Sequence, residues 1–240
     1  MMAAIYACYG MPKSGSTLAF EMTLAVLELG GIPQRRLSRE AIPGETGANV
    51  LPLFRPVYIK AALREIGEAG HPRPIAIRTH GGVWQITADT IAAGQMIGQA
   101  VARDPRDLAL SLLDSARFGG AWGTRDGQPL ATLDDAMEIV RGHVHKFRQW
   151  QSQPGFLTLN YEELAFKSHR AVARIAAQLE IEVDPRQVLS RIERRFTQLN
   201  KGVSQRWRDE MPPEVANRYY DEFAEFIETW CLPPGLPGRV

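Results

Sequence analysis

The sequence predicts an α/β fold in which a parallel β-sheet is flanked by helices. Two observations predict it. Short apolar segments alternate with longer segments whose apolar residues recur every three or four positions, as in strand–helix–strand units. Turn-forming residues, among them Gly10, Gly81 and the pair Asp104–Pro105, follow the first three apolar segments within a few positions, so that each segment can turn into the next element.

The predicted elements follow one another in this alternation. Residues 3–9 form the first strand because they are apolar and lead into a glycine-containing turn. Residues 17–29 form a helix, since apolar residues recur at helical spacing from Leu18 to Leu29 and Gly30 ends the pattern. Further strands are predicted over 75–78, 96–101 and 155–159, and further helices over 105–118, 133–150, from 161, and over 171–179, 185–196 and 212–230.

Length and composition indicate one globular unit. The chain has 240 residues, 45% of them apolar, and no linker divides it, so we expect a single domain over residues 1–240. Twenty-eight basic side chains nearly balance 27 acidic ones, which leaves no general positive field for a nucleic-acid backbone. We therefore expect no nucleic-acid partner.

The cysteines and the apolar segments indicate a cytoplasmic protein. Cys8 and Cys231 lie far apart and have no CxxC spacing, so they predict neither a disulfide framework nor a zinc site. The start of the chain lacks the basic residues and the long apolar run of a signal peptide. No uncharged apolar stretch approaches the roughly 20 residues that cross a bilayer, and we expect no membrane association.

The loop YGMPKSGST lies between the first predicted strand and helix and has the chemistry of an anion site. Gly10 and Gly15 are spaced as in the P-loop pattern GxxxxGK(S/T), which predicts the three-layer architecture of P-loop NTPases. Backbone N–H groups and the positive end of the helix favour an anion there. Ser16 takes the place of the P-loop lysine, and Lys13 is the cation of the loop. It can stabilise the negative charge that grows on a leaving oxygen.

The position of this cation also bears on the transferred group. Phosphoryl transfer from ATP needs Mg²⁺ to offset the charge of the phosphates. A sulfuryl group carries one negative charge, which one lysine, hydroxyl groups and backbone amides can offset. We therefore predict no metal. Asp104, which could be taken for a metal-binding aspartate at a strand end, is predicted to cap the helix that begins at Pro105. Asp107 follows three residues later, as in a reciprocal cap.

The loop resembles the nucleotide-sulfate-binding loop of the cytosolic-type sulfotransferase family, and further segments agree in order and kind from about Tyr6 to Trp207. They are IRTHGG, VARDPRDLALS, LTLNYEEL and LNKGVSQRWRDEM. The resemblance implies a P-loop-like fold and transfer of a sulfuryl group from 3′-phosphoadenosine 5′-phosphosulfate (PAPS). The product of this donor is 3′,5′-adenosine bisphosphate (PAP).

The resemblance also implies roles for single residues. His80 would be the general base, and Lys13, His80 and Ser111 are the predicted catalytic residues. The predicted donor-binding residues are Lys13, Ser14, Gly15, Ser16 and Thr17 for the 5′-phosphosulfate, Arg103, Ser111, Lys201 and Gly202 for the 3′-phosphate, and Tyr161 for the adenine. Trp207 and Arg208 also match the family pattern, whereas Asn200 replaces its usual arginine and Arg78 its usual lysine.

Several alternatives stay open at this point. The chain could be a P-loop small-molecule kinase that uses ATP and Mg²⁺, or a nucleotide-binding homologue without turnover. A carboxylate could replace His80 as the base. The acceptor is expected to be a small molecule with a hydroxyl or amine, bound near residues 34–73 and 118–125, but its identity and the oligomeric state cannot be read from the sequence. His143 and His145 lie two apart on a predicted helix and therefore do not form a metal pair.

Overall fold

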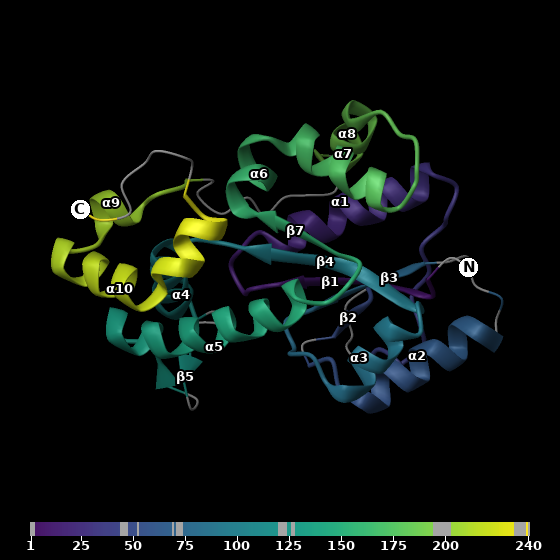
Figure 1. The fold of residues 1–240 in the computed structure, drawn as a ribbon, viewed down its shortest axis with the longest axis horizontal. Helices are drawn as coiled ribbons and strands as arrows, with labels where there is room; N and C mark the ends of the chain where they lie inside the picture. The colour runs from purple at the N-terminus through teal and green to yellow at the C-terminus, as the bar shows by residue number, and fades with distance from the viewer. Residues whose placement is uncertain are drawn as a thin grey trace.

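A computed structural model of the chain describes residues 3–43, 48–51, 53–68, 70, 74–119, 124–125, 128–193, 203–232 and 239. Five parallel strands form its main sheet (Figure 1). In spatial order they are β2 (Val50–Leu51), β3 (Ile75–Thr79), β1 (Ile5–Gly10), β4 (Met96–Ala102) and β7 (Phe156–Asn160). The short strands β5 (Thr124–Arg125) and β6 (Gln128–Pro129) pair antiparallel outside this sheet.

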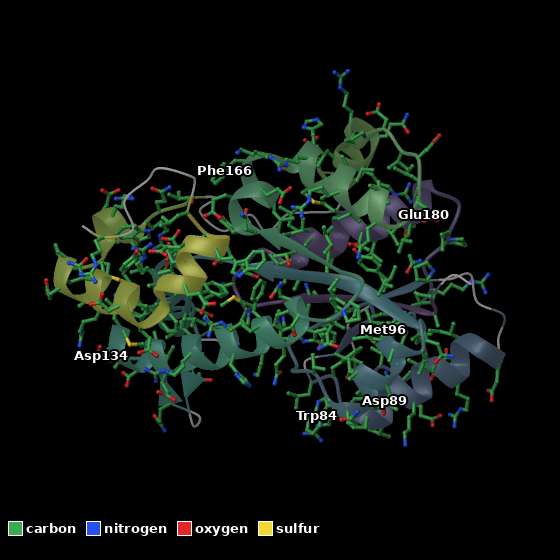
Figure 2. All side chains as sticks on the ribbon, viewed as in Figure 1. Trp84, Asp89, Met96, Asp134, Phe166 and Glu180 are labelled. Atoms are coloured by element: carbon green, nitrogen blue, oxygen red, sulfur yellow. The ribbon has the colours of Figure 1, made fainter. Side chains whose placement is uncertain are left out.

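Helices cover both faces of the main sheet, which confirms the predicted three-layer α/β architecture (Figure 1). One layer holds α1 (Ser16–Leu29), α6 (Tyr161–Phe166), α7 (Ser168–Gln178) and α8 (Pro185–Glu193). The other side holds α2 (Pro56–Glu68), α3 (Gln85–Ala92), α4 (Pro105–Arg117) and α5 (Leu133–Gln151), with α9 (Trp207–Glu210) and α10 (Pro213–Trp230) beyond the ends of the strands. Trp84 and Asp89 lie on the side of α3, and Phe166 and Glu180 on the opposite side (Figure 2).

The central strand β1 shows why both layers are needed. All six of its residues are buried, and successive side chains point to opposite faces of a strand. Ile5 and Tyr9 accordingly join the apolar cluster under α2, α4, α5 and α10, whereas Tyr6 and Cys8 join the cluster under α1, α7 and α8. A strand buried on both faces is typical of a parallel sheet between two helical layers.

Most predicted elements are present with boundaries shifted by one to three residues. The first strand begins at Ile5 instead of residue 3, and the helix predicted over 171–179 begins at Ser168. Helix α8 is described to Glu193, so residues 194–196 of its predicted range lie outside the described residues. The structure adds β2, α2, α3, β5, β6 and α9, which were not predicted from the sequence. Among the described helices, none has the length and apolar character needed to cross a lipid bilayer.

The topology brings the predicted site segments to one edge of the sheet. Strands β3, β1, β4 and β7 are parallel, so their carboxyl ends meet at the same edge. The segments that follow β1, β3, β4 and β7 begin at Met11, His80, Arg103 and Tyr161, respectively. Strand β1 lies between β3 and β4, where the chain order reverses, and ligands of open α/β sheets bind at such a point.

Candidate functional site

The loop after β1 is a tight turn built on two left-handed residues. Lys13 has a φ of 68° and Gly15 a φ of 84°. The hydroxyl of Ser14 donates to the carbonyl oxygen of Met11 at 2.6 Å, and its backbone N–H donates to the same oxygen at 3.1 Å. A Cβ on Gly10 would lie 2.5 Å from the Cβ of Ser16, so only glycine fits there. Hydrogen bonds and close contacts within the loop therefore define its conformation, and Ser14 contributes to it.

The first turn of α1 has the properties of an anion site. Gly15 is the N-cap and offers no side-chain oxygen, and the first turn contains no acidic residue. The N–H groups at this positive end of the helix consequently have no competing side-chain acceptor at the cap. The pKa of Lys13 is lowered by burial and, to a smaller extent, by the positive charge of Arg103, while Asp114 opposes the shift. Arg103 donates to the carbonyl oxygen of Lys13, so both basic residues belong to this part of the site.

His80 follows β3 and is attached to the start of this loop. Its side chain is 8% exposed, and Nδ1 lies 2.6 Å from the carbonyl oxygen of Gly10. A carbonyl oxygen can only accept, so Nδ1 carries the proton and the lone pair of the neutral ring is on Nε2. Burial lowers the pKa of His80 to about 4, although the hydrogen bond to Gly10 opposes this shift. At neutral pH the ring is uncharged and can accept a proton.

Gly81 fixes the backbone on the other side of His80. Its N–H donates to Oγ1 of Thr79 at 3.0 Å, and its carbonyl oxygen accepts from Nε1 of Trp150 at 2.8 Å. A Cβ at this position would lie 2.4 Å from the backbone nitrogen of Phe54. Such close packing leaves the segment after β3 little freedom, which keeps the imidazole in place.

Arg78 connects β3 with the start of α1. Its Nη1 donates to Oγ1 of Thr17 at 2.5 Å, and its guanidinium lies 5.8 Å from the centre of the Phe20 ring. Burial lowers the pKa of Arg78. The position at which this sequence departs from the family pattern therefore places a positive charge beside Thr17.

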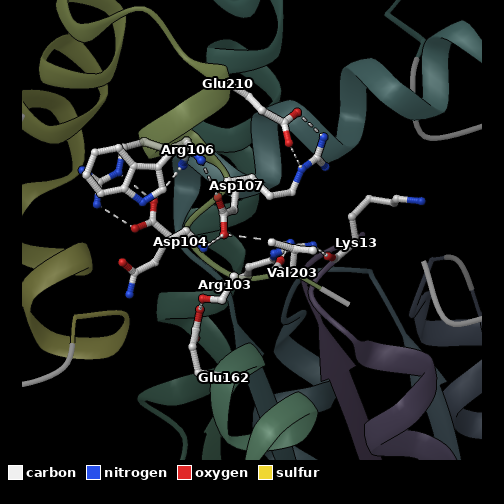
Figure 3. A network of polar contacts seen from close by, with 12 residues as sticks. Lys13, Arg103, Asp104, Arg106, Asp107, Glu162, Val203 and Glu210 are labelled. Atoms are coloured by element: carbon white, nitrogen blue, oxygen red, sulfur yellow. Dashed lines mark hydrogen bonds and ion pairs between the residues drawn. The ribbon is translucent and has the colours of Figure 1, made fainter. Parts of the chain in front are cut away.

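Arg103 brings together three segments that are distant in the sequence. Its Nη1 donates to the carbonyl oxygen of Lys13 at 2.8 Å and its Nη2 to that of Val203 at 3.2 Å (Figure 3). The guanidinium lies 4.0 Å from the centre of the Tyr161 ring, a cation–π distance. A Cβ on Gly15 would lie 3.3 Å from the same ring. Lys13, Arg103 and Tyr161 thus surround one end of the loop.

The N-cap and the second turn of α4 hold two further predicted residues, Asp104 and Ser111. Oδ1 of Asp104 accepts from the backbone N–H of Arg106 at 2.9 Å, which confirms the predicted cap. Its carboxylate also binds the guanidinium of Arg106 at 2.9 and 2.7 Å. Ser111 is fully buried, and its hydroxyl has no hydrogen-bond partner among the described residues.

The segment before α9 is described only in part. Asn200, Lys201 and Gly202 lie outside the described residues, so their roles stay predictions. Trp207 is fully buried, and the guanidiniums of Arg106 and Arg208 lie 3.5 and 4.4 Å from the centre of its rings. Trp207 therefore packs against Arg106 of α4, and Arg208 lies over the same indole.

The two histidines of α5 lie in different environments. His143 is buried and His145 is exposed, as their spacing predicts. Within the described part of the chain, no three His, Cys, Asp or Glu side chains are grouped as metal ligands. The absence of a metal from the reaction remains a prediction.

A further group of polar residues, apart from Asp107 as the expected partner of Asp104 in the helix cap, was not predicted from the sequence. Asp107 accepts the backbone N–H groups of Gln205 and Trp207. Nearby, Glu162 accepts from the hydroxyl of Ser204, and Asp114 pairs with Arg206. The spacing of Asp107, Ser111 and Asp114 by four and three residues was the available signal, because it places them on one face of α4.

The free energy of unfolding is expected to fall as the pH is lowered from about 6.5 toward 4. Burial lowers the pKa of His80 to about 4 and of His143 to about 3, so both are neutral when folded, whereas the unfolded chain takes up protons near pH 6.5. In this window each histidine should then lower the free energy of unfolding by about 1.4 kcal/mol for each pH unit. Denaturant titration of His143→Gln should show a smaller pH slope than the wild type, and exposed His145→Gln should not.

The chain is similar to solved sulfotransferase structures, although no protein-family model and no curated protein matches it. Mouse sulfotransferase SULT7A1 complexed with PAP is 20% identical, with a TM-score of 0.59 over 94% of this chain and 85% of that one. Retinol dehydratase complexed with retinol and PAP is 14% identical, with a TM-score of 0.59 over 98% and 83%. Retinol dehydratase with androsterone and PAP is 16% identical, with a TM-score of 0.57 over 97% and 83%. The chain therefore has the fold predicted from its sequence.

Proposed function

We propose that residues 1–240 form one sulfotransferase domain, which moves a sulfuryl group from PAPS to a hydroxyl or amine of a small-molecule acceptor. One observation carries the proposal: the neutral imidazole of His80 is hydrogen-bonded to Gly10, where the anion-binding loop begins. A proton acceptor and an anion site thus share one edge of the sheet. A nucleotide-binding protein without turnover would not need the two to be coupled.

The polar groups at the site fit the donor. Among the described residues, Oγ of Ser111 and Nε of Arg103 are buried without a hydrogen-bond partner. Buried donors of this kind are normally satisfied, and phosphate oxygens are strong acceptors for them. Arg103 and Ser111 would hold the 3′-phosphate together with Lys201 and Gly202, Tyr161 would contact the adenine, and the 5′-phosphosulfate would be held by Lys13, Ser14, Gly15, Ser16 and Thr17.

In the proposed reaction the acceptor oxygen or nitrogen attacks sulfur while its proton passes to Nε2 of His80. The bond between sulfur and the 5′-phosphate oxygen breaks, and the bisphosphate leaves with the bonding electrons. Lys13 stabilises the negative charge on this oxygen. Ser111 would contribute to catalysis by fixing the 3′-phosphate, which keeps the donor aligned for attack.

The proposal also covers the class of acceptor and the cellular location. Retinol and androsterone are bound in the retinol dehydratase structures, and a small-molecule acceptor beside His80 would be consistent with this fold. We propose a cytoplasmic enzyme that uses no metal, nucleic-acid partner or membrane. A kinase is disfavoured because Ser16 stands where a P-loop lysine would bind the phosphates of ATP.

Calorimetric titration with PAP and, separately, with Mg-ATP tests the donor. PAP is expected to bind at least about tenfold more tightly, since buried hydrogen bonds to a charged group contribute about 1.5–3 kcal/mol each. Ser111→Ala should reduce this preference because it removes one such donor. A preference for Mg-ATP would overturn the proposed function.

A further inference from the structure

We propose that Asp107 is a positioning residue for the 3′-phosphate site: it holds residues 203–207 against α4 and thereby fixes the guanidinium of Arg103. The inference rests on the proposed donor. It concerns a buried polar network between α4, the start of α6 and the segment that leads into α9 (Figure 3).

The carboxylate of Asp107 is fully buried and binds this segment through both oxygens. Oδ2 accepts from the backbone N–H of Gln205 at 2.7 Å, and Oδ1 accepts from that of Trp207 at 3.1 Å. Gln205 has a φ of 58°, a left-handed conformation that is unfavourable for a residue with a Cβ. The two hydrogen bonds offset this cost and define the path of the backbone.

Two other carboxylates, those of Glu162 in α6 and Asp114 in α4, hold neighbouring residues of the same segment. The hydroxyl of Ser204 donates to Oε1 of Glu162 at 2.7 Å. Nη2 of Arg206 lies 2.9 Å from Oδ2 of Asp114, and the guanidinium also binds Glu210 at 2.8 and 2.6 Å. Residues 204–207 are therefore attached to α4 and α6 one after another, and we call residues 203–207 the strip.

Arg103 lies between this strip and α4. Its Nη2 donates to the carbonyl oxygen of Val203 at 3.2 Å and lies 4.0 Å from Oδ2 of Asp107. The charge of Asp107 and the carbonyl that the strip presents thus orient the guanidinium together. A fixed guanidinium loses less side-chain entropy when it binds a phosphate.

Ser111 belongs to the same arrangement. It lies four residues after Asp107 and three before Asp114, so the three side chains share one face of α4. The face of α4 that holds the strip therefore also carries the buried hydroxyl of Ser111. This hydroxyl has no hydrogen-bond partner among the described residues. Asp107 thus couples the strip to Arg103 and Ser111, two of the predicted ligands of the 3′-phosphate.

The sign of the effect of Asp107→Asn distinguishes positioning from simple electrostatics. Removal of a negative charge close to an anion site would, by itself, strengthen phosphate binding. Weaker binding can therefore arise only through the lost attachment of the strip and of Arg103. An amide has one acceptor oxygen and cannot receive both backbone N–H groups as the carboxylate does.

The experiment measures the affinities of wild type and Asp107→Asn for PAP and for adenosine 5′-monophosphate, which lacks the 3′-phosphate. The wild type should prefer PAP, and Asp107→Asn should reduce this preference by about tenfold or more. Effects on the 5′-phosphate and adenine contacts cancel in the ratio. Without ligand, the amide hydrogens of Gln205 and Trp207 should also exchange faster in Asp107→Asn, while those of β1 should not.

Glu163→Gln is the matched control, because Glu163 is a buried carboxylate of α6 that pairs with Arg174 of α7 at 2.5 Å. This variant should lose a buried carboxylate, as Asp107→Asn does, but keep the wild-type ratio of the affinities for PAP and adenosine 5′-monophosphate. An unchanged or increased preference in Asp107→Asn would overturn the inference alone. If the wild type showed no preference for PAP, the proposed donor would fail first, and the inference with it.

If Asp107→Asn does not fold, Asp114→Asn provides a second test of the inference. Its carboxylate is 18% exposed and touches the strip only through Arg206, so the protein should tolerate the change. The preference for PAP should fall by about threefold or more, since one partly exposed ion pair is lost. A preference equal to that of the wild type in this variant would overturn the inference.

Discussion

Replacement of His80 by asparagine is expected to lower kcat for sulfuryl transfer by about 10²–10⁴-fold, the usual contribution of a general base. Asparagine can still donate to the carbonyl oxygen of Gly10, as Nδ1 of His80 does at 2.6 Å, but its side chain cannot take up the acceptor's proton. Steady-state kinetics with saturating PAPS would measure the loss. Binding of PAP should change little, because the predicted nucleotide contacts come from other residues.

The pH dependence gives a second measure of the same role. Burial lowers the pKa of His80 to about 4, so the neutral, proton-accepting ring persists well below pH 6.5. The acid limb of kcat/KM for the wild type should therefore lie nearer pH 4 than pH 6.5. His145→Asn, on the exposed side of α5, is the control and should leave kcat unchanged. Full activity of His80→Asn would assign the base to another group, such as a carboxylate.

The parts of the fold that the sequence predicted well are those with strong local patterns. Strand β1 and helix α1 adjoin a glycine-containing loop. All six residues of β1 are buried, and α1 is rich in apolar residues. Asp104 could be recognised as a cap because its function involves only the next two residues. In such places, local sequence and tertiary structure favour the same conformation.

Of the helices that were not predicted from the sequence, α2 and α3 were missed for different reasons. In α2, Ile59, Ala62 and Ile66 are buried at helical spacing, so its signal was present within a region interpreted mainly as part of the acceptor site. Helix α3 has only eight residues, of which Thr87, Thr90 and Ile91 are buried, and two of these three are polar. A pattern of apolar residues cannot identify a helix whose buried face is largely threonine.

The polar network around Asp107 could not be predicted from local patterns. Asp107 lies 98 residues from Gln205 and 100 from Trp207 in sequence, and its position three residues after Asp104 is that of a reciprocal helix cap. In the structure Asp104 alone acts as the cap, and Asp107 turns to the distant backbone. Only the tertiary fold decides between these two uses of one carboxylate.

Replacement of Lys13 by alanine is expected to lower kcat by about 10²–10³-fold and to change the affinity for PAP much less. The ammonium group would act mainly on charge that develops as the sulfur–oxygen bond breaks, and loss of one such interaction costs about 2.7–4 kcal/mol of transition-state stabilisation. An interaction made only in the transition state lowers kcat without weakening ground-state binding. Single-turnover kinetics together with calorimetry would separate the two.

Comparison with Lys13→Gly separates the charge from the shape of the loop. The φ of 68° at this position is unfavourable for lysine and alanine but not for glycine. Glycine should therefore preserve the turn at least as well as alanine, while both lack the ammonium group. If charge is what matters, the two variants lose kcat equally and Lys13→Arg recovers part of it. A glycine variant with near wild-type kcat would show instead that loop geometry, and not the cation, limits the reaction.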